Sequence, residues 1–235
     1  MKSPAAIRGG VPAASSRGGR SQGAVQARRP LGGGVSSDRK DWVFRFTLFV
    51  AGVALRPFFR LEIQGEENLP RDRGFVLLPK HQRWEDIPLL SLAAKRPLYY
   101  VAKVELFRKG FCDWFLRSLG GLPLNREKPL AGKRYLQAML TLLGEGEGVV
   151  VFPEGTYFRD RMGPGQVGIV RLILSRLPMP FIPVGIRYSG GRGRCLVQVR
   201  FGRALHAEKS ASPKEFVDEI MARIAELSEF SPAGC

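Results

Sequence analysis

The stretch FVLLPKHQRWEDIPLLSL (residues 75–92) contains a strand, a polar loop and the start of a helix. Residues 75–78 form an apolar run typical of a short buried strand, and residues 87–92 have the composition of a helix. His81 and Asp86 lie in the loop between them. In an open α/β sheet, ligands bind outside the carboxyl ends of the strands, which is where this loop would lie. The order therefore favours an α/β fold with His81 at its binding edge.

His81 and Asp86 have the spacing of a general base and its orienting carboxylate. Histidine titrates near neutral pH, and the chain contains only two histidines. Residues five apart inside a regular helix diverge by about 140°, so His81 must lie in or just before the first turn if the two side chains are to meet. His-x4-Asp also occurs by chance, and a lone loop histidine is usually a solvated bystander. The pair alone leaves both interpretations open.

A second polar residue is expected at the same edge of the sheet, in the segment GEGVVVFPEGT (residues 146–156). Residues 149–152 are β-branched or aromatic and suit a strand buried on both faces. Pro153 donates no ladder hydrogen bond, so the strand should stop there and place Glu154 at its carboxyl end. An exposed acid in an ordinary strand-ending turn is the alternative interpretation.

Two further apolar segments have the character of strands. GGLPLNR (residues 120–126) is a short strand that delivers Arg126, whose planar fork of donors suits a phosphate. PFIPVGI (residues 180–186) is apolar and too rich in proline for a helix.

In this order and spacing, the four segments resemble the glycerolipid acyltransferase family, whose best-known members acylate lysophosphatidic acid. The resemblance runs from about Leu61 to about Tyr188. The family's first block, His-x4-Asp, matches His81 and Asp86, and its second, a glycine-led strand ending in arginine, matches residues 120–126. The third block, Phe-Pro-Glu-Gly-Thr, is present at residues 152–156, and the fourth, around Ile-Pro-Val, at residues 182–184.

The resemblance implies a single α/β domain, with a mixed and largely parallel sheet wrapped by helices. It implies transfer of a fatty acyl group from a thioester to a free hydroxyl of a lysophospholipid, most directly 1-acyl-glycerol-3-phosphate giving phosphatidic acid. His81 would take the hydroxyl proton, and Asp86 would hold the imidazole in the right tautomer. The donor would be acyl-CoA or acyl carrier protein, and no metal or tightly bound cofactor is implied.

The resemblance also assigns residues to the acceptor. Arg126, with Arg159 as a weaker candidate, would bind the acceptor phosphate. The family pattern places Glu154, Gly155 and Thr156 in acceptor binding as well.

Two positions depart from the family pattern. Tyr157 and Phe158 stand where many members carry an arginine, and Gln166 and Val167 stand where a lysine is common. Both departures fall in the region that holds the acceptor head group. Acylation of a different lysolipid is therefore the alternative.

The first forty residues are basic and rich in Gly, Ser, Arg, Ala and Pro. They hold eight Lys or Arg against the single Asp38, which gives +7 of the net +16 and leaves +9 for the rest of the chain. Such a segment supplies no core, so we expect a disordered arm; an organellar transit peptide is the alternative. A basic surface favours anionic partners, either membrane lipid or nucleic acid.

Residues 41–60 combine a wide apolar arc with a narrow basic stripe. The uncharged run between Arg45 and Arg56 has ten residues, against about twenty for a membrane-spanning helix. At 100° per residue Arg45, Gly52 and Arg56 share one stripe, which is typical of a helix lying in the membrane interface. A core helix packed on the domain is the alternative. The expected organisation is a basic arm, an interfacial helix and an acyltransferase domain: residues 1–40, 41–60 and 61–230.

Other function classes fit less of the sequence. A non-enzymatic nucleic-acid or membrane binder would use the basic charge, but the chain has no helix-turn-helix, zinc or RNA-binding signature, so no nucleic-acid partner is expected. A thioester hydrolase would keep the fold and replace the lipid hydroxyl by water. Cys112, Cys195 and Cys235 lack metal spacing, which favours free thiols in a reducing compartment. We expect a peripheral or monotopic membrane enzyme that faces the cytoplasm.

Overall fold

The computed structural model describes residues 38–107, 110–124, 129–190, 193–207 and 212–230, with side chains undescribed for residues 129–135. The chain divides into residues 1–33 and residues 34–235, and the second unit contains all of the described part. Nearly all of the predicted basic arm, and Arg126, therefore lie outside the described residues.

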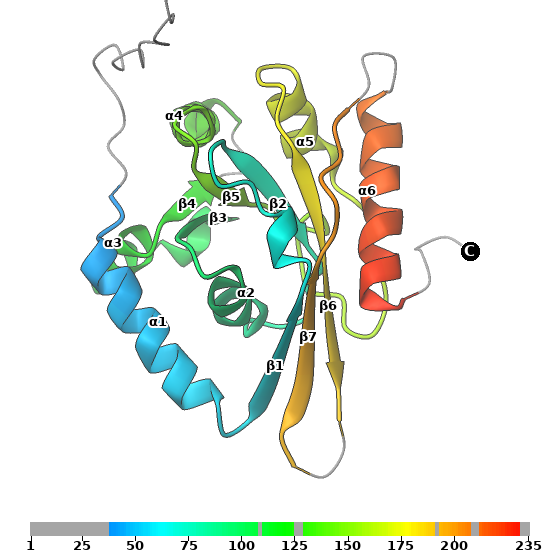
Figure 1. The fold of residues 1–235 in the computed structure, drawn as a ribbon. Helices are drawn as coiled ribbons and strands as arrows, with labels where there is room; N and C mark the ends of the chain where they lie inside the picture. The colour runs from blue at the N-terminus through cyan, green and yellow to red at the C-terminus, as the bar shows by residue number, and fades with distance from the viewer. Residues whose placement is uncertain (1–37, 108–109, 125–128, 191–192, 208–211, 231–235) are drawn as a thin grey trace, which may run out of the picture. The chain divides into compact units, whose positions relative to one another are not determined.

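A seven-stranded sheet with the order β1-β7-β6-β2-β5-β3-β4 forms the centre of the described unit (Figure 1). Its strands are β1 (Phe59–Gln64), β2 (Phe75–Pro79), β3 (Leu98–Lys103), β4 (Gly121–Leu124), β5 (Gly148–Val150), β6 (Phe181–Ser189) and β7 (Cys195–Phe201). All neighbours pair in parallel except β6 and β7, which are antiparallel. This confirms the predicted mixed, largely parallel sheet.

Helices cover both faces of the sheet (Figure 1). They are α1 (Asp41–Leu55), α2 (Asp86–Ala94), α3 (Phe111–Ser118), α4 (Pro129–Gly144), α5 (Val167–Leu174) and α6 (Pro213–Ser228), with short 3₁₀ helices η1 (Glu66–Asn68) and η2 (Val104–Leu106). Alternation along β2 explains the two layers. Val76 and Leu78 pack toward α4, α5 and α6, whereas Phe75 and Leu77 pack toward α2.

The parallel pairing brings several loops to one edge of the sheet. The strands β2, β5, β3 and β6 all run in one direction, so their carboxyl ends deliver the following residues together: His81 after β2, Glu154 after β5, Lys103 at the end of β3 and Tyr188 near the end of β6. This is the edge at which the sequence placed the binding site.

Helix α1 is shorter than the predicted 41–60 segment. It ends at Leu55, because Pro57 has no backbone N–H to continue the helical hydrogen bonds, and Phe59 and Arg60 already belong to β1. Val43 and Phe44 are buried, whereas Trp42, Phe46, Phe49, Val50 and Val53 are exposed. The helix thus packs on the domain through one face and leaves a second apolar face open. Within the described residues, no helix combines the length and apolarity needed to cross a bilayer.

Candidate active site

The loop after β2 folds back so that His81 meets Asp86. The Lys80 N–H extends the ladder to β6 by donating to the Val184 carbonyl at 2.9 Å. The chain then turns, and α2 begins at Asp86 itself. His81 Nδ1 lies 3.1 Å from Asp86 Oδ2. His81 therefore precedes the helix, the arrangement that the five-residue spacing requires.

Asp86 is fully buried and accepts hydrogen bonds on both carboxylate oxygens. Oδ2 also accepts from the backbone N–H groups of Gln82 at 2.6 Å and Arg83 at 2.8 Å. Oδ1 accepts from the Tyr188 hydroxyl at 2.6 Å. Burial and the nearby Asp86 carboxylate raise the pKa of Tyr188, so its hydroxyl stays a donor throughout the neutral range. These bonds fix the orientation of the carboxylate that faces His81.

The contact with Asp86 decides which nitrogen of His81 is basic. A carboxylate accepts a hydrogen bond from Nδ1–H, which leaves the lone pair of the neutral ring on Nε2. Among the described residues, Nε2 has no hydrogen-bond partner. The ring stacks on Phe152, with centroids 3.7 Å apart and planes at 23°, and it contacts Tyr157 at 4.3 Å. The imidazole is held on both sides with one nitrogen available.

Glu154 was predicted to take part in acceptor binding, and the structure places its carboxylate in a hydrogen-bond network with the histidine loop. Its side chain is buried and accepts both from Lys80 Nζ, at 2.9 Å to each oxygen, and from the Gly163 N–H at 2.6 Å. Glu154 Oε2 also accepts from the His81 backbone N–H at 3.0 Å. Glu154 thus fixes the backbone of the histidine loop, and its role in acceptor binding stays a prediction.

Lys80 is a buried cation that the sequence analysis missed. Besides Glu154, its ammonium group donates to the Phe158 carbonyl at 2.7 Å. Burial lowers the pKa of Lys80, and the hydrogen bond and charge of Glu154 partly offset that effect. The Phe158 N–H donates in turn to the His81 carbonyl at 2.9 Å. Lys80 therefore joins the His81 loop to the loop that follows Glu154.

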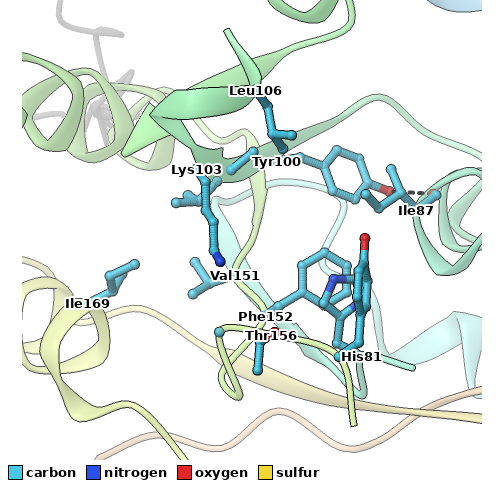
Figure 2. Close-up of a pocket in the computed structure, with 13 residues that line it drawn as sticks. His81, Ile87, Tyr100, Lys103, Leu106, Val151, Phe152, Thr156 and Ile169 are labelled. Carbon is cyan, nitrogen blue, oxygen red and sulfur yellow. Dashed lines mark hydrogen bonds between the residues drawn. The ribbon is translucent and has the colours of Figure 1, made fainter. Parts of the chain in front are cut away.

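A pocket of about 270 Å³ opens beside the free edge of His81 (Figure 2). The residues lining it are His81, Ile87, Tyr100, Val101, Ala102, Lys103, Leu106, Val151, Phe152, Gly155, Thr156, Tyr157 and Ile169. Gly155 adopts φ +71°, a left-handed conformation that favours glycine and closes the turn onto the Phe152 carbonyl at 3.1 Å. Of the predicted acceptor residues, Gly155 and Thr156 line this pocket.

Lys103 is a second residue that the sequence analysis missed. It extends into the pocket from the end of β3 (Figure 2), and among the described residues it is the only lysine or arginine in the lining. The sequence feature that could have identified it is a lysine at the end of a mainly apolar strand. Arg159 is exposed and lies outside the lining, and Arg126 lies outside the described residues. The structure thus offers Lys103 as a cation beside His81.

The departures from the family pattern lie around the same pocket. Tyr157 lines it, whereas Phe158 packs its backbone against the histidine loop. The Gln166 N–H donates to the Pro153 carbonyl at 2.8 Å, and Val167 begins α5. Tyr157 therefore is the departure that reaches the pocket.

An apolar cavity of about 140 Å³ lies next to the pocket, between α1 and α2. Ile87 and Tyr100 line both spaces. Burial raises the pKa of Tyr100, whose hydroxyl lies 2.6 Å from Ser91 Oγ. The described residues contain no group of three or more His, Cys, Asp or Glu side chains placed to hold a metal ion.

Comparison with known proteins agrees with this geometry. The family model described as "Acyltransferase" matches residues 60–187, more than half of the chain. The chain belongs to the Acyltransferase family. Its curated relatives include the 1-acyl-sn-glycerol-3-phosphate acyltransferase BAT2, chloroplastic, of Brassica napus, which is 32% identical over 143 residues, 60% of this chain and 41% of that protein. Another is the 1-acyl-sn-glycerol-3-phosphate acyltransferase of Bacillus subtilis, 36% identical over 97 residues, 41% of this chain and 48% of that protein. The matches thus span less than half the length of these relatives.

A solved structure shares the fold. The crystal structure of the 1-acyl-sn-glycerophosphate acyltransferase PlsC from Thermotoga maritima superposes with a TM-score of 0.65. The match covers 80% of this chain and 79% of that chain, at 23% sequence identity. At this identity the likeness establishes the arrangement of strands and helices alone.

Proposed function

We propose that this chain is an O-acyltransferase that moves a fatty acyl group from an acyl thioester to the free hydroxyl of a lysophospholipid. The most direct acceptor is 1-acyl-glycerol-3-phosphate, with phosphatidic acid as product. The observation that carries the proposal is His81, oriented by the buried Asp86 and presenting Nε2 to a pocket of about 270 Å³. The names of the curated relatives support the same acceptor.

The reaction needs a base and a charge stabiliser. The acceptor oxygen bonds to the thioester carbonyl carbon while its proton passes to His81 Nε2. The tetrahedral adduct then expels sulfur, which takes the proton back from the imidazolium and leaves as a thiol. Asp86 stabilises the imidazolium in between, at 3.1 Å from Nδ1. The acceptor hydroxyl is the nucleophile throughout.

The acceptor phosphate requires cations near the pocket. Lys103 lines the pocket and is our first candidate. Arg126, two residues after the end of β4 in the sequence, is the second candidate, and Arg159 is a weaker one. A charge-assisted contact to phosphate favours a lysophosphatidic acid over a neutral lysolipid. Acyl-CoA or acyl carrier protein serves as the thioester donor, with no bound cofactor.

Membrane association follows from α1. Its exposed residues Trp42, Phe46, Phe49 and Val53 form an apolar face, and Arg45 and Arg56 lie at its border. An amphipathic helix with this pattern lies in the plane of the interface and is attracted to anionic lipid. We propose a peripheral or monotopic enzyme, with its active site on a reducing side such as the cytoplasm. The free thiols of Cys112 and Cys195 support that placement.

The reaction is tested with purified protein, radiolabelled acyl-CoA or acyl carrier protein, and lysolipids that differ only in head group. We expect labelled phosphatidic acid to form from 1-acyl-glycerol-3-phosphate faster than any neutral diacyl product. Faster acylation of lysophosphatidylcholine would replace the acceptor and keep the enzyme class. Release of free fatty acid at the same rate with and without lysolipid would indicate a hydrolase. Thioester left intact under all conditions would overturn the enzymatic proposal.

The role of α1 is tested by replacing Phe46, Phe49 and Val53 together with Ser. All three side chains are exposed, so the fold loses no core contact and every charge is kept. We expect sedimentation with phosphatidylcholine vesicles to fall sharply, because apolar area leaves the interface. Undiminished sedimentation would contradict the interfacial role of this helix.

A further inference from the structure

Helix α3 exposes aromatic side chains, while its charged side chains are only partly exposed and pair with each other. Phe111 is 72% exposed and Trp114 is 39% exposed. By contrast, the side chains of Asp113 and Arg117 are 34% and 26% exposed and form an ion pair at 2.8 Å. The Arg117 guanidinium also lies over the ring of Phe107, 5.6 Å from its centroid. A helix on a water-facing surface has the opposite arrangement.

The aromatic residues of α3 lie next to one another. The ring of Phe111 lies 5.6 Å from that of Trp114 and 5.7 Å from that of the partly exposed Phe115, where the two planes differ by only 12°. Leu106, at the end of η2 and five residues before Phe111 in the sequence, is exposed and lines the reaction pocket. We call Leu106, Phe111, Trp114 and Phe115 the α3 surface. Through Leu106, this set includes a residue of the pocket that contains His81.

Helix α3 lies next to the start of α1 (Figure 1). The Lys40 N–H donates to the Ser118 carbonyl at 2.9 Å, which ties the start of α1 to the end of α3. The Lys40 ammonium lies over the Trp114 ring, 5.1 Å from its centroid. Trp42, exposed on α1, follows two residues later. Two helices thus present aromatic residues next to each other.

We propose that the α3 surface contacts the lipid bilayer together with α1, so that two neighbouring helices form the membrane-binding surface. The inference rests on the proposed function, because it takes a membrane lipid as the acceptor. Tryptophan rings favour the membrane–water interface, where an apolar ring and a polar N–H are both satisfied. Lys40, Arg45 and Lys103 flank the aromatic residues with positive charge, which complements anionic lipid.

A second contact changes what the membrane does for catalysis. A 15-residue helix is about 22 Å long and fixes only one direction of the protein on the bilayer. A neighbouring contact off the axis of α1 also fixes rotation about that axis. Because Leu106 belongs both to the α3 surface and to the pocket, the fixed orientation holds the pocket mouth at the bilayer surface. A lysolipid then reaches His81 without leaving the interface.

The chain's three tryptophans allow each helix to be probed separately. Trp42→Phe with Trp84→Phe leaves Trp114 as the reporter of α3, and Trp84→Phe with Trp114→Phe leaves Trp42 as the reporter of α1. The vesicles are phosphatidylcholine and phosphatidylglycerol in which the phosphatidylcholine chains carry bromine near the head group. We expect the emission of Trp114 to shift to the blue and to be quenched by the bromine, since the apolar face of an interfacial helix lies ~5–10 Å deep. As a control, Glu219→Trp on the exposed face of α6, in a protein without the other three tryptophans, should keep its emission.

Each outcome has a separate meaning. Quenching of Trp42 without quenching of Trp114 would overturn the inference and leave the α1 proposal standing. Absence of quenching at both positions would overturn both. A blue shift of Trp114 that appears with protein concentration before vesicles are added, together with a dimer in sedimentation, would mean that a second copy covers the α3 surface.

A paired substitution gives an independent measure. Phe111→Ser removes an exposed aromatic ring, whereas Cys112→Ser alters the neighbouring exposed residue of the same helix with little loss of apolar area. We expect Phe111→Ser to weaken partition onto the anionic vesicles about tenfold, on the scale for burying one aromatic side chain. Cys112→Ser should leave it unchanged. Equal partition of both variants and the wild type would overturn the inference, provided that their circular dichroism spectra agree.

Discussion

The loop around His81 and the paired helices α1 and α3 distribute polar and apolar side chains in opposite ways. At the loop, the charged groups of Lys80, Asp86 and Glu154 are buried. On the helices, aromatic residues such as Trp42 and Phe111 are exposed. Both arrangements oppose the general preference for apolar residues inside and charges outside. Each is therefore explained by something other than burial of a core.

The two regions differ in whether the chain itself supplies the partners. The buried charges accept or donate hydrogen bonds within the described residues, so that their desolvation is compensated internally. The exposed rings of α1 and α3 have only partial cover from this chain. The comparison teaches that the closed network holds the reactive geometry, whereas the open surface requires a partner from outside.

The largest expected effect is at the centre of the closed network. His81→Ala should lower acyl transfer by at least ~10²–10⁴-fold, the usual contribution of a general base. His206→Ala is the matched control, because His206 is exposed and far from the pocket lining. Turnover and vesicle binding are measured side by side, and vesicle binding should be unchanged. Near-normal turnover in His81→Ala would remove the proposed chemistry.

The buried ion pair should dominate stability. Lys80→Met leaves the Glu154 carboxylate buried without its cation, and such a loss costs about 3–5 kcal/mol of unfolding free energy. The control is Lys214→Met, which breaks the exposed pair with Asp218 on α6 and should leave the urea midpoint almost unchanged. Adding Glu154→Gln to Lys80→Met should recover part of the stability. Equal urea midpoints for Lys80→Met and Lys214→Met would mean that the buried pair of Lys80 and Glu154 contributes no more to stability than an exposed pair does.

Sequence patterns predicted the local parts of this fold well. The apolar runs at residues 75–78 and 181–186 lie in β2 and β6, and the segment at residues 120–126 contains β4. These features depend on neighbouring residues, so the local apolar pattern is sufficient to identify them. The order of the strands depends on distant pairings and came only from the structure.

The sites were predictable to the extent that their partners are close in sequence. His81 and Asp86 are five residues apart, and the spacing and the family resemblance together predicted the contact that the structure shows. Glu154 is 74 residues from Lys80, and Tyr188 is 102 residues from Asp86, so neither partner was visible in any local pattern. For α3, periodicity can locate an aromatic face, but only tertiary packing decides that it is turned outward.

Lys103 lines the pocket between the hydrogen-bonded histidine loop and the exposed helices, and its replacement tests binding of the acceptor phosphate. Lys103→Ala should raise the acceptor KM about 10–100-fold, because a charge-assisted contact to phosphate contributes roughly 1.5–3 kcal/mol. The donor KM should change little. Arg159→Ala serves as the comparison, since Arg159 is exposed and outside the pocket lining, and its effect should be smaller. The opposite ranking of the two variants would assign the phosphate to the loop after Glu154.

The smallest effect is expected from the Tyr188 hydroxyl, at the margin of the closed network. Tyr188→Phe keeps the ring that packs edge-on against Phe59 and lies under the Arg83 guanidinium, and removes only the hydrogen bond to Asp86 Oδ1. Asp86 retains three other partners, so we expect kcat to fall by about three- to tenfold, corresponding to roughly 0.5–1.5 kcal/mol. A change in acceptor KM with kcat preserved would place Tyr188 in substrate binding instead.

The free energy of unfolding at high pH provides a second test of the Tyr188 hydroxyl. Burial and Asp86 raise the pKa of Tyr188 in the folded protein, so above about pH 10 the unfolded chain loses the proton while the folded chain keeps it. In that range the unfolded state binds fewer protons than the native state does, so the free energy of unfolding falls as the pH rises. Tyr188→Phe should therefore show a shallower loss of unfolding free energy between about pH 10 and 11 than the wild type does.

Tyr100→Phe removes another buried hydroxyl whose pKa is raised by burial, and should also make the loss of unfolding free energy shallower at high pH. Its loss of kcat should be smaller than that of Tyr188→Phe, because the Tyr100 hydroxyl contacts Ser91 and Ile87 and not Asp86. If both variants lost kcat equally, the effect of Tyr188 would belong to general packing and not to the orientation of Asp86.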